Sequence, residues 1–158
     1  MRYKMILAKS AALVLLPIFA MSATQARAQN QTPANVGPVV GGWTDPATGL
    51  MWTKQDNGSD VNWNQANAYC ANMRLGGYTD WRLPTIDELQ DIYDPSVDVT
   101  VEGIVHVKGK IRLSAKWEWS SSLKNAGEAW FFYFVGGGRG SNLINDHSYG
   151  NHALCVHR

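Results

Sequence analysis

Apolar side chains recur at helical spacing in one stretch of the first half of the chain. Asn62 is followed three residues later by Gln65, which is the pattern of a capping box at a helix start. The apolar positions at this start are Trp63, Ala66, Tyr69, Cys70 and Met73. This spacing predicts a helix with one buried face, ended by Gly76 and Gly77, with Cys70 directed into the core.

A second capping box predicts another short helix. Thr85 and Glu88 have the required spacing, and Pro84 stands just before them. The helix is expected to run to about Tyr93, because Pro95 cannot continue it.

The remaining pattern is typical of strands. An early hairpin is predicted, with strands at 39–43 and 50–52 around a turn at 45–49. Later strands are predicted at 101–107, 110–113, 117–121, 129–135, 141–144 and 153–156. The segment 129–135 is apolar throughout, which predicts a strand buried on both faces at the centre of the sheet. Helices early and strands late indicate an α+β fold with two short helices on a twisted, mainly antiparallel sheet.

The N-terminus has the pattern of an export signal. Basic side chains at Arg2, Lys4 and Lys9 precede an apolar run over 11–21, and a small-x-small cleavage site follows at 26–28. The apolar run is about half the ~20 residues of a membrane span, so no span is expected in the mature chain. We therefore expect an exported protein, periplasmic or secreted, divided into a signal peptide at 1–28, a flexible leader at 29–38 and one domain at 39–158.

The net charge of the chain changes sign once the predicted signal peptide is left out. The whole chain has 14 Lys and Arg against 13 Asp and Glu, but residues 1–28 carry four of the bases and no acid. The remaining 130 residues are therefore mildly acidic. Nucleic acid is not an expected partner, because it is bound mainly through basic surfaces.

Cys70 and Cys155 are the two cysteines of the chain. An exported protein meets an oxidising compartment, where these two residues form the one possible intramolecular disulfide. The alternative is a reactive thiol or a bridge between chains.

Several strings resemble the Lcl C-terminal domain family, named after a collagen-like adhesin. The most specific is Asp80–Thr85 (Asp-Trp-Arg-Leu-Pro-Thr), followed by Glu88 and Leu89. Further matches are Asp45–Trp52, Ala68–Cys70, Trp119–Ser122, Ala129–Trp130 and Cys155–Val156. The resemblance covers essentially residues 43 to 158. Two departures are the lack of a collagen-like region and a histidine at 157, where arginine is common in the family.

The resemblance implies a C-type-lectin-like fold, with chain ends close together and a disulfide from a helix to the last strand. It also implies an exported bacterial protein, and the named member of the family binds sulfated glycosaminoglycans. In such a domain Asp80–Pro84 is expected to be structural, with Trp81 packed, Arg82 bonded to backbone or an acid, and a helix starting at Pro84 and Thr85.

Two groups of residues are candidates for ligand binding. The first is basic and is predicted to project from one side of a strand, where it would suit a sulfated glycan or would protect a sheet edge from aggregation. It comprises Lys108, Lys110, Arg112 and Lys116. The second lies in the polar loop surface between 136 and 152. It comprises Arg139, Asn142, Asn145, Asp146, His147 and Tyr149.

No metal, cofactor or catalytic group is expected. Asn145 and Asp146 resemble part of a lectin calcium site, but the remaining oxygen ligands are not identifiable. His147, His152 and His157 are interpreted as exposed loop histidines, since a five-residue spacing does not converge on one ion. No nucleophile motif accompanies the serines. Two functions remain: a binding module for a glycan or envelope polysaccharide, or a structural domain that meets an envelope protein and binds no sugar.

Overall fold

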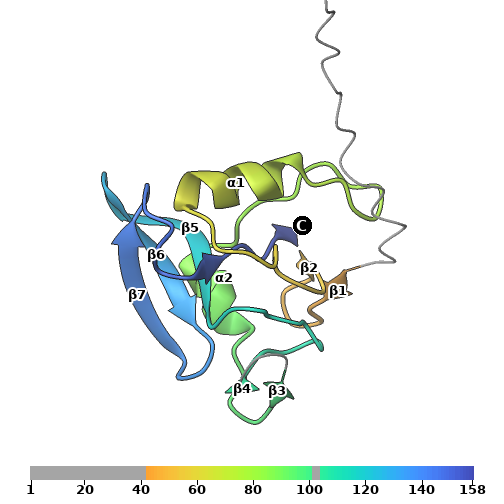
Figure 1. The fold of residues 1–158 in the computed structure, drawn as a ribbon. Helices are drawn as coiled ribbons and strands as arrows, with labels where there is room; N and C mark the ends of the chain where they lie inside the picture. Colours follow the sequence, from red (N-terminus) through yellow and green to blue (C-terminus); the bar gives the residue numbers. More distant parts are fainter. Residues whose placement is uncertain (1–41, 101–103) are drawn as a thin grey trace, which may run out of the picture. The chain divides into compact units, whose positions relative to one another are not determined.

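A computed structural model describes residues 42–100 and 104–158 (Figure 1). The predicted signal peptide at 1–28, the leader at 29–38 and the first residues of the predicted hairpin lie outside the described residues. Among the described residues, no helix has the length and apolar character to cross a membrane.

The first helix, α1 (Trp63–Asn72), begins as predicted. The Asn62 side chain accepts from the Gln65 backbone N–H, and the Gln65 side chain accepts from the Asn62 backbone N–H. Ala66 and Cys70 form its buried face, whereas Tyr69 is exposed. The helix ends at Asn72, before the two glycines that were expected to stop it.

The second helix, α2 (Ile86–Asp91), has the predicted capping box at Thr85 and Glu88. The expected role of the preceding segment is confirmed. Trp81 is buried, and its Nε1–H donates to the Leu75 carbonyl. The Arg82 guanidinium donates two hydrogen bonds to the Glu88 carboxylate, at 2.7 and 2.8 Å. The segment therefore fixes the start of α2 against the rest of the domain.

The Arg82–Glu88 pair makes stability depend on pH. Burial alone would raise the pKa of Glu88, but the bonds from Arg82 and Thr85 lower it below its ordinary value. The pair's stabilisation is thus present above the unfolded pKa of Glu88 and is lost as the pH falls through the folded pKa. We expect Arg82→Ala to reduce the free energy of unfolding by about 1 kcal/mol at pH 7 and by almost nothing at pH 2. Urea unfolding at both pH values measures this.

Arg74→Ala is the matched control, because Arg74 is an exposed arginine that bonds to the backbone carbonyls of Ala71 and Met73 and not to an acid. Its effect on unfolding should be the same at both pH values. An Arg82→Ala loss that persists at pH 2 would show that the pair is not responsible.

Three sheets occur among the described residues. The first has the order β1-β2-β9, with β1 (Trp43–Thr44), β2 (Met51–Trp52) and β9 (Val156–His157) all antiparallel. The second pairs β3 (Val99–Thr100) with β4 (Ile104–Val105). The third has the order β7-β6-β5-β8 and contains β5 (Trp117–Asn125), β6 (Glu128–Tyr133), β7 (Gly138–Leu143) and β8 (Asn151–His152).

The α+β class is confirmed, and the sheets are mainly antiparallel, but β8 runs parallel to β5. In the four-stranded sheet, β6 is flanked by β5 and β7 and is therefore internal, as predicted (Figure 1). Its burial on both faces is partial: Ala129 and Phe132 are buried, while Trp130, Phe131 and Tyr133 are half-buried.

Two strand predictions need correction. The segment 110–113 is not a strand: Arg112 forms one isolated bridge with Gln55, and Gly109 and Lys110 have positive φ. Ile111 and Leu113 do alternate inward, but a strand also needs a hydrogen-bonded partner along its length. The predicted strand at 153–156 is divided, because 153–155 connects β8 to β9.

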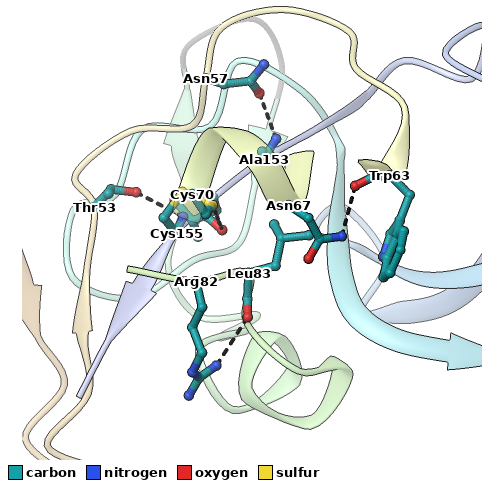
Figure 2. The surroundings of a disulfide bond; sticks show 10 residues. Thr53, Asn57, Trp63, Asn67, Cys70, Arg82, Leu83, Ala153 and Cys155 are labelled. Carbon is teal, nitrogen blue, oxygen red and sulfur yellow. Dashed lines mark hydrogen bonds between the residues drawn. A yellow bond between two sulfur atoms is a disulfide. The ribbon is translucent and has the colours of Figure 1, made fainter. Parts of the chain in front are cut away.

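The disulfide between Cys70 and Cys155 is present, with Cα atoms 5.5 Å apart (Figure 2). It joins α1 to the residue before β9, and both cysteines belong to a buried cluster that includes Trp81 and Trp119. The surrounding backbone is also tied down. Thr53 and Cys155 exchange two hydrogen bonds, and the Ala153 N–H donates to the Asn57 side chain. Loop 53–57 and connection 153–155 thus form one bonded unit.

Candidate functional site

Three ionisable side chains are buried together beside β5 and β8. Asp56 comes from the loop after β2, Glu118 from β5 and His152 from β8. Glu118 and His152 are paired across the parallel β5–β8 ladder, which places them on the same face of the sheet. One candidate ligand atom from each of the three residues lies within 4.8 Å of the other two. We call these three residues the buried triad.

Asp56 is the most heavily bonded member of the triad. Its carboxylate accepts from the backbone N–H groups of Gly58, Ser114 and Ala115 and from the Ser114 hydroxyl, which lies 2.7 Å away. Burial alone would raise the pKa of Asp56, but the hydrogen bonds from His152 and Ser114 lower it below its ordinary value. Asp56 therefore carries a negative charge inside the protein and connects two loops.

His152 lies between two carboxylates. Its Nδ1 is 3.3 Å from Asp56 Oδ2 and 3.0 Å from Ser114 Oγ, and its Nε2 is 3.1 Å from Asp60 Oδ1. Burial alone would lower the pKa of His152, but the two carboxylates raise it above its ordinary value. At neutral pH this favours an imidazolium that bridges Asp56 and Asp60.

Glu118 has no such partners. Its side chain is fully buried, and its polar neighbours, the Asp56 carboxylate and the Leu154 backbone N–H, do not make well-formed hydrogen bonds with it. Burial first, and the negative charge of Asp56 second, raise the pKa of Glu118 well above its ordinary value. Burial beside Asp56 thus favours the protonated, neutral form of Glu118.

A cleft of about 260 Å³ opens beside the triad. Its walls contain the aromatic ring of Trp117, the ionisable side chains of Lys116 and Asp60, and His152 of the triad. They are formed by Asp60, Val105, Leu113, Ser114, Ala115, Lys116, Trp117, Gly150 and His152. The Trp117 ring stacks on Tyr133, with centroids 5.7 Å apart and an interplanar angle of 22°, which restricts its orientation.

The predicted basic group does not form one face of a strand, which corrects that expectation. Lys108 donates to the Asp91 carbonyl, Lys110 is exposed in a turn, and Arg112 is exposed beside Gln55. Lys116 alone of the four lines the cleft. The group is separated because a turn at 109–110 interrupts the segment, and no strand carries it.

The predicted loop residues are brought together only in part: Asn145, Asp146 and His147 line a second, shallow pocket, and the other three do not. The Arg139 guanidinium is bound to Asp87 and Gln90 of α2, at 2.6 and 2.8 Å. Asn142 donates to Asn151, and Asn145 accepts from Asn64. The carboxylate of Asp146 accepts from the Ser148 N–H within its own loop. His147 and Tyr149 are exposed.

Two of the three histidines interpreted as exposed are buried. His152 belongs to the triad, and His157 lies in β9, with its Nδ1 2.8 Å from Asp80 and its ring stacked on Tyr78. The five-residue spacing gave no warning, because His152 and His157 enter two different short strands, β8 and β9. His147 alone is exposed, as expected.

Sequence reasoning missed Asp56, Ser114, Trp117 and Glu118 as site residues. A signal for Glu118 was present, since it stands between two tryptophans in a segment predicted as a strand. Nothing local marked Asp56, because its contact with His152 spans 96 residues of sequence.

Fold and site together define a small α+β domain, closed by one disulfide, with a polar cleft over a buried charged cluster. The chain belongs to the Lcl C-terminal domain family, whose sequence model matches residues 41–157. A search of curated proteins finds no match.

Proposed function

We propose that this protein is an exported, non-catalytic binding module with a C-type-lectin-like fold, and that it recognises a glycan or an envelope polysaccharide in the cleft. The observation that carries the proposal is the presence of Trp117 in the cleft wall together with the exposed residues Lys116 and Asp60. Periplasmic or secreted placement is part of the proposal and rests on the sequence of residues 1–28.

The chemistry of the cleft suits a sugar. An aromatic ring offers an apolar face to the C–H groups of a pyranose, and the stacking of Trp117 on Tyr133 reduces the cost of holding that ring in place. Lys116 supplies a cation for a sulfate or carboxylate, while Asp60 accepts from hydroxyl groups. Of the residues predicted to bind a ligand, Lys116 lines this cleft and the predicted loop residues do not.

The arrangement of Ser114 supports a non-catalytic role. Ser114 Oγ contacts His152, and His152 contacts Asp60, an order that resembles a catalytic triad. However, the Ser114 hydroxyl donates to Asp56, so its proton is directed away from the imidazole of His152. A nucleophilic serine instead donates its proton to the histidine that acts as its base.

A second candidate function is a structural or protein-interaction domain of the cell envelope. The specific observation in its favour is a pair of apolar side chains, Leu123 of β5 and Leu143 of β7, each about half exposed. They lie near the same end of the sheet, because Leu123 pairs with Ala129 and Leu143 pairs with Glu128. A protein partner would cover such a pair.

The two functions are separated by titrating the oxidised protein with sulfated and neutral glycans at two salt concentrations. We expect binding by the wild type, a loss of about tenfold or more in affinity for Trp117→Ala, and a loss confined to sulfated glycans and low salt for Lys116→Ala. Isothermal titration calorimetry measures these affinities.

Lys124→Ala and Leu123→Ala are the controls, because both residues are exposed on β5 and neither lines the cleft. Both variants should bind glycans as the wild type does. Absence of binding to every glycan would reject the first function. A stable oligomer that Leu123→Ala dissociates would then support the second.

A further inference from the structure

Glu118 presents a problem that the proposed glycan site does not solve. Its carboxyl group is fully buried beside the carboxylate of Asp56 and the backbone N–H of Leu154, and neither neighbour makes a well-formed hydrogen bond with it. Buried carboxyl groups in proteins are normally paired, hydrogen-bonded or bound to a metal. Two buried carboxyl groups packed together are costly in a low dielectric, because they cannot both ionise unless a cation or a proton lies between them.

The donor atoms converge on a common point. Asp56, Glu118 and His152 each present one atom within 4.8 Å of the other two. A cation bonded at about 2.1 Å to each atom in tetrahedral geometry would hold them about 3.4 Å apart, so the widest pair would have to close by up to about 1.4 Å. The β5–β8 ladder holds Glu118 and His152 in register, and the hydrogen bonds of Asp56 fix the third ligand.

The surroundings of His152 are those of a metal ligand. Its Nδ1 faces the triad, and its Nε2 is 3.1 Å from Asp60 Oδ1. A histidine that binds a metal through one ring nitrogen commonly donates the other N–H to a carboxylate, which fixes the tautomer and orients the ring. Asp60 is thus a positioning residue for His152.

The cleft supplies access. Ser114 and His152 line both the cleft and the edge of the triad. Three protein ligands leave at least one coordination position for water or another oxygen ligand. The site therefore has an entry path as well as a donor set.

We propose that Asp56, Glu118 and His152 form a binding site for one divalent transition-metal ion. One imidazole and two carboxylates suit Zn²⁺ or Mn²⁺, whereas Ca²⁺ requires six to eight oxygen ligands. This inference does not depend on glycan binding, since it concerns residues behind the cleft wall. The alternative occupant of the site is a proton on Glu118.

The test is a titration of the whole protein, first freed of metal with a chelator, with Zn²⁺, Mn²⁺ and Ca²⁺ in turn. We expect one Zn²⁺ or Mn²⁺ per chain and a higher melting temperature with the metal bound, but neither effect with Ca²⁺. Glu118→Gln should reduce the affinity at least a hundredfold. The neutral amide resembles the protonated acid in shape, so this variant should fold as the metal-free wild type does.

Two controls have matched chemistry. Glu128→Gln changes a glutamate of the neighbouring strand β6 that pairs with Lys124, and His147→Gln removes the exposed histidine. Both should bind metal as the wild type does. If Glu118→Gln fails to fold, Asp60→Asn replaces it, because Asp60 is exposed and its loss should weaken binding about 10–100-fold.

The proposal is overturned if the wild type takes up no stoichiometric metal, because the triad is then occupied by a proton. It is also overturned if Glu118→Gln or Asp60→Asn binds as tightly as the wild type, or if His147→Gln abolishes binding. These outcomes are distinct from failure of the glycan proposal, because no sugar is present in the titration.

Discussion

Reduction of the Cys70–Cys155 disulfide is expected to lower the free energy of unfolding by roughly 2–5 kcal/mol. The value should lie toward the upper end, because the two cysteines are 85 residues apart and the bond removes much of the unfolded chain's freedom. Urea unfolding of the oxidised protein and of the Cys70→Ala/Cys155→Ala variant measures the difference. Such a loss is large compared with the 5–15 kcal/mol that typically stabilises a domain.

The single variants extend this test. Cys70→Ala leaves Cys155 as a free thiol, and Cys155→Ala leaves Cys70 free. Under reducing conditions each single variant should have the same free energy of unfolding as the double variant. Reductant should have no effect on the double variant itself. A double variant that unfolds at the same urea concentration as the oxidised protein would contradict the assigned role of the bond.

Replacement of Asp56 by alanine is expected to lower the free energy of unfolding by roughly 3 kcal/mol. The change removes the acceptor of three backbone N–H groups and of the Ser114 hydroxyl, and it leaves the buried ring of His152 without its inner carboxylate. Asp56→Asn retains one oxygen acceptor and should cost less. Urea unfolding at neutral pH, with chelator present, measures both losses without a contribution from metal.

Asp94→Ala provides the comparison for Asp56. Asp94 likewise accepts a backbone N–H and a hydroxyl, both from Ser96, but it does so at the surface. Its replacement should change the free energy of unfolding by less than about 1 kcal/mol. Equal losses in the free energy of unfolding for Asp56→Ala and Asp94→Ala would mean that burial of the Asp56 hydrogen bonds adds nothing to stability.

The helices could be predicted from the sequence because their signals are local. The capping boxes at Asn62 and Thr85 involve residues three apart, and both appear as expected. The strand predicted at 110–113 failed for the opposite reason. Its apolar alternation is real, but alternation reports which side chains are buried, whereas a strand depends on a partner elsewhere in the chain.

The candidate site could not be assembled from the sequence. Asp56, Glu118 and His152 are drawn from a loop and two strands, and their contact depends on the parallel β5–β8 pairing. Short strands such as β8, which has two residues, leave almost no periodic signal. His152 was therefore assigned to an exposed loop, and the cleft beside it could not be foreseen.

The position of β9 constrains the order of events during synthesis. Residues 151–157 supply the parallel partner of β5, one half of the disulfide and the partner of β2. A nascent chain that has reached residue 150 already contains Cys70 and α1, but it contains neither the sulfur that Cys70 requires nor the strand that covers β2. The domain therefore cannot close stepwise from its N-terminus, and its disulfide and two of its sheets are completed only when the last eight residues are in place.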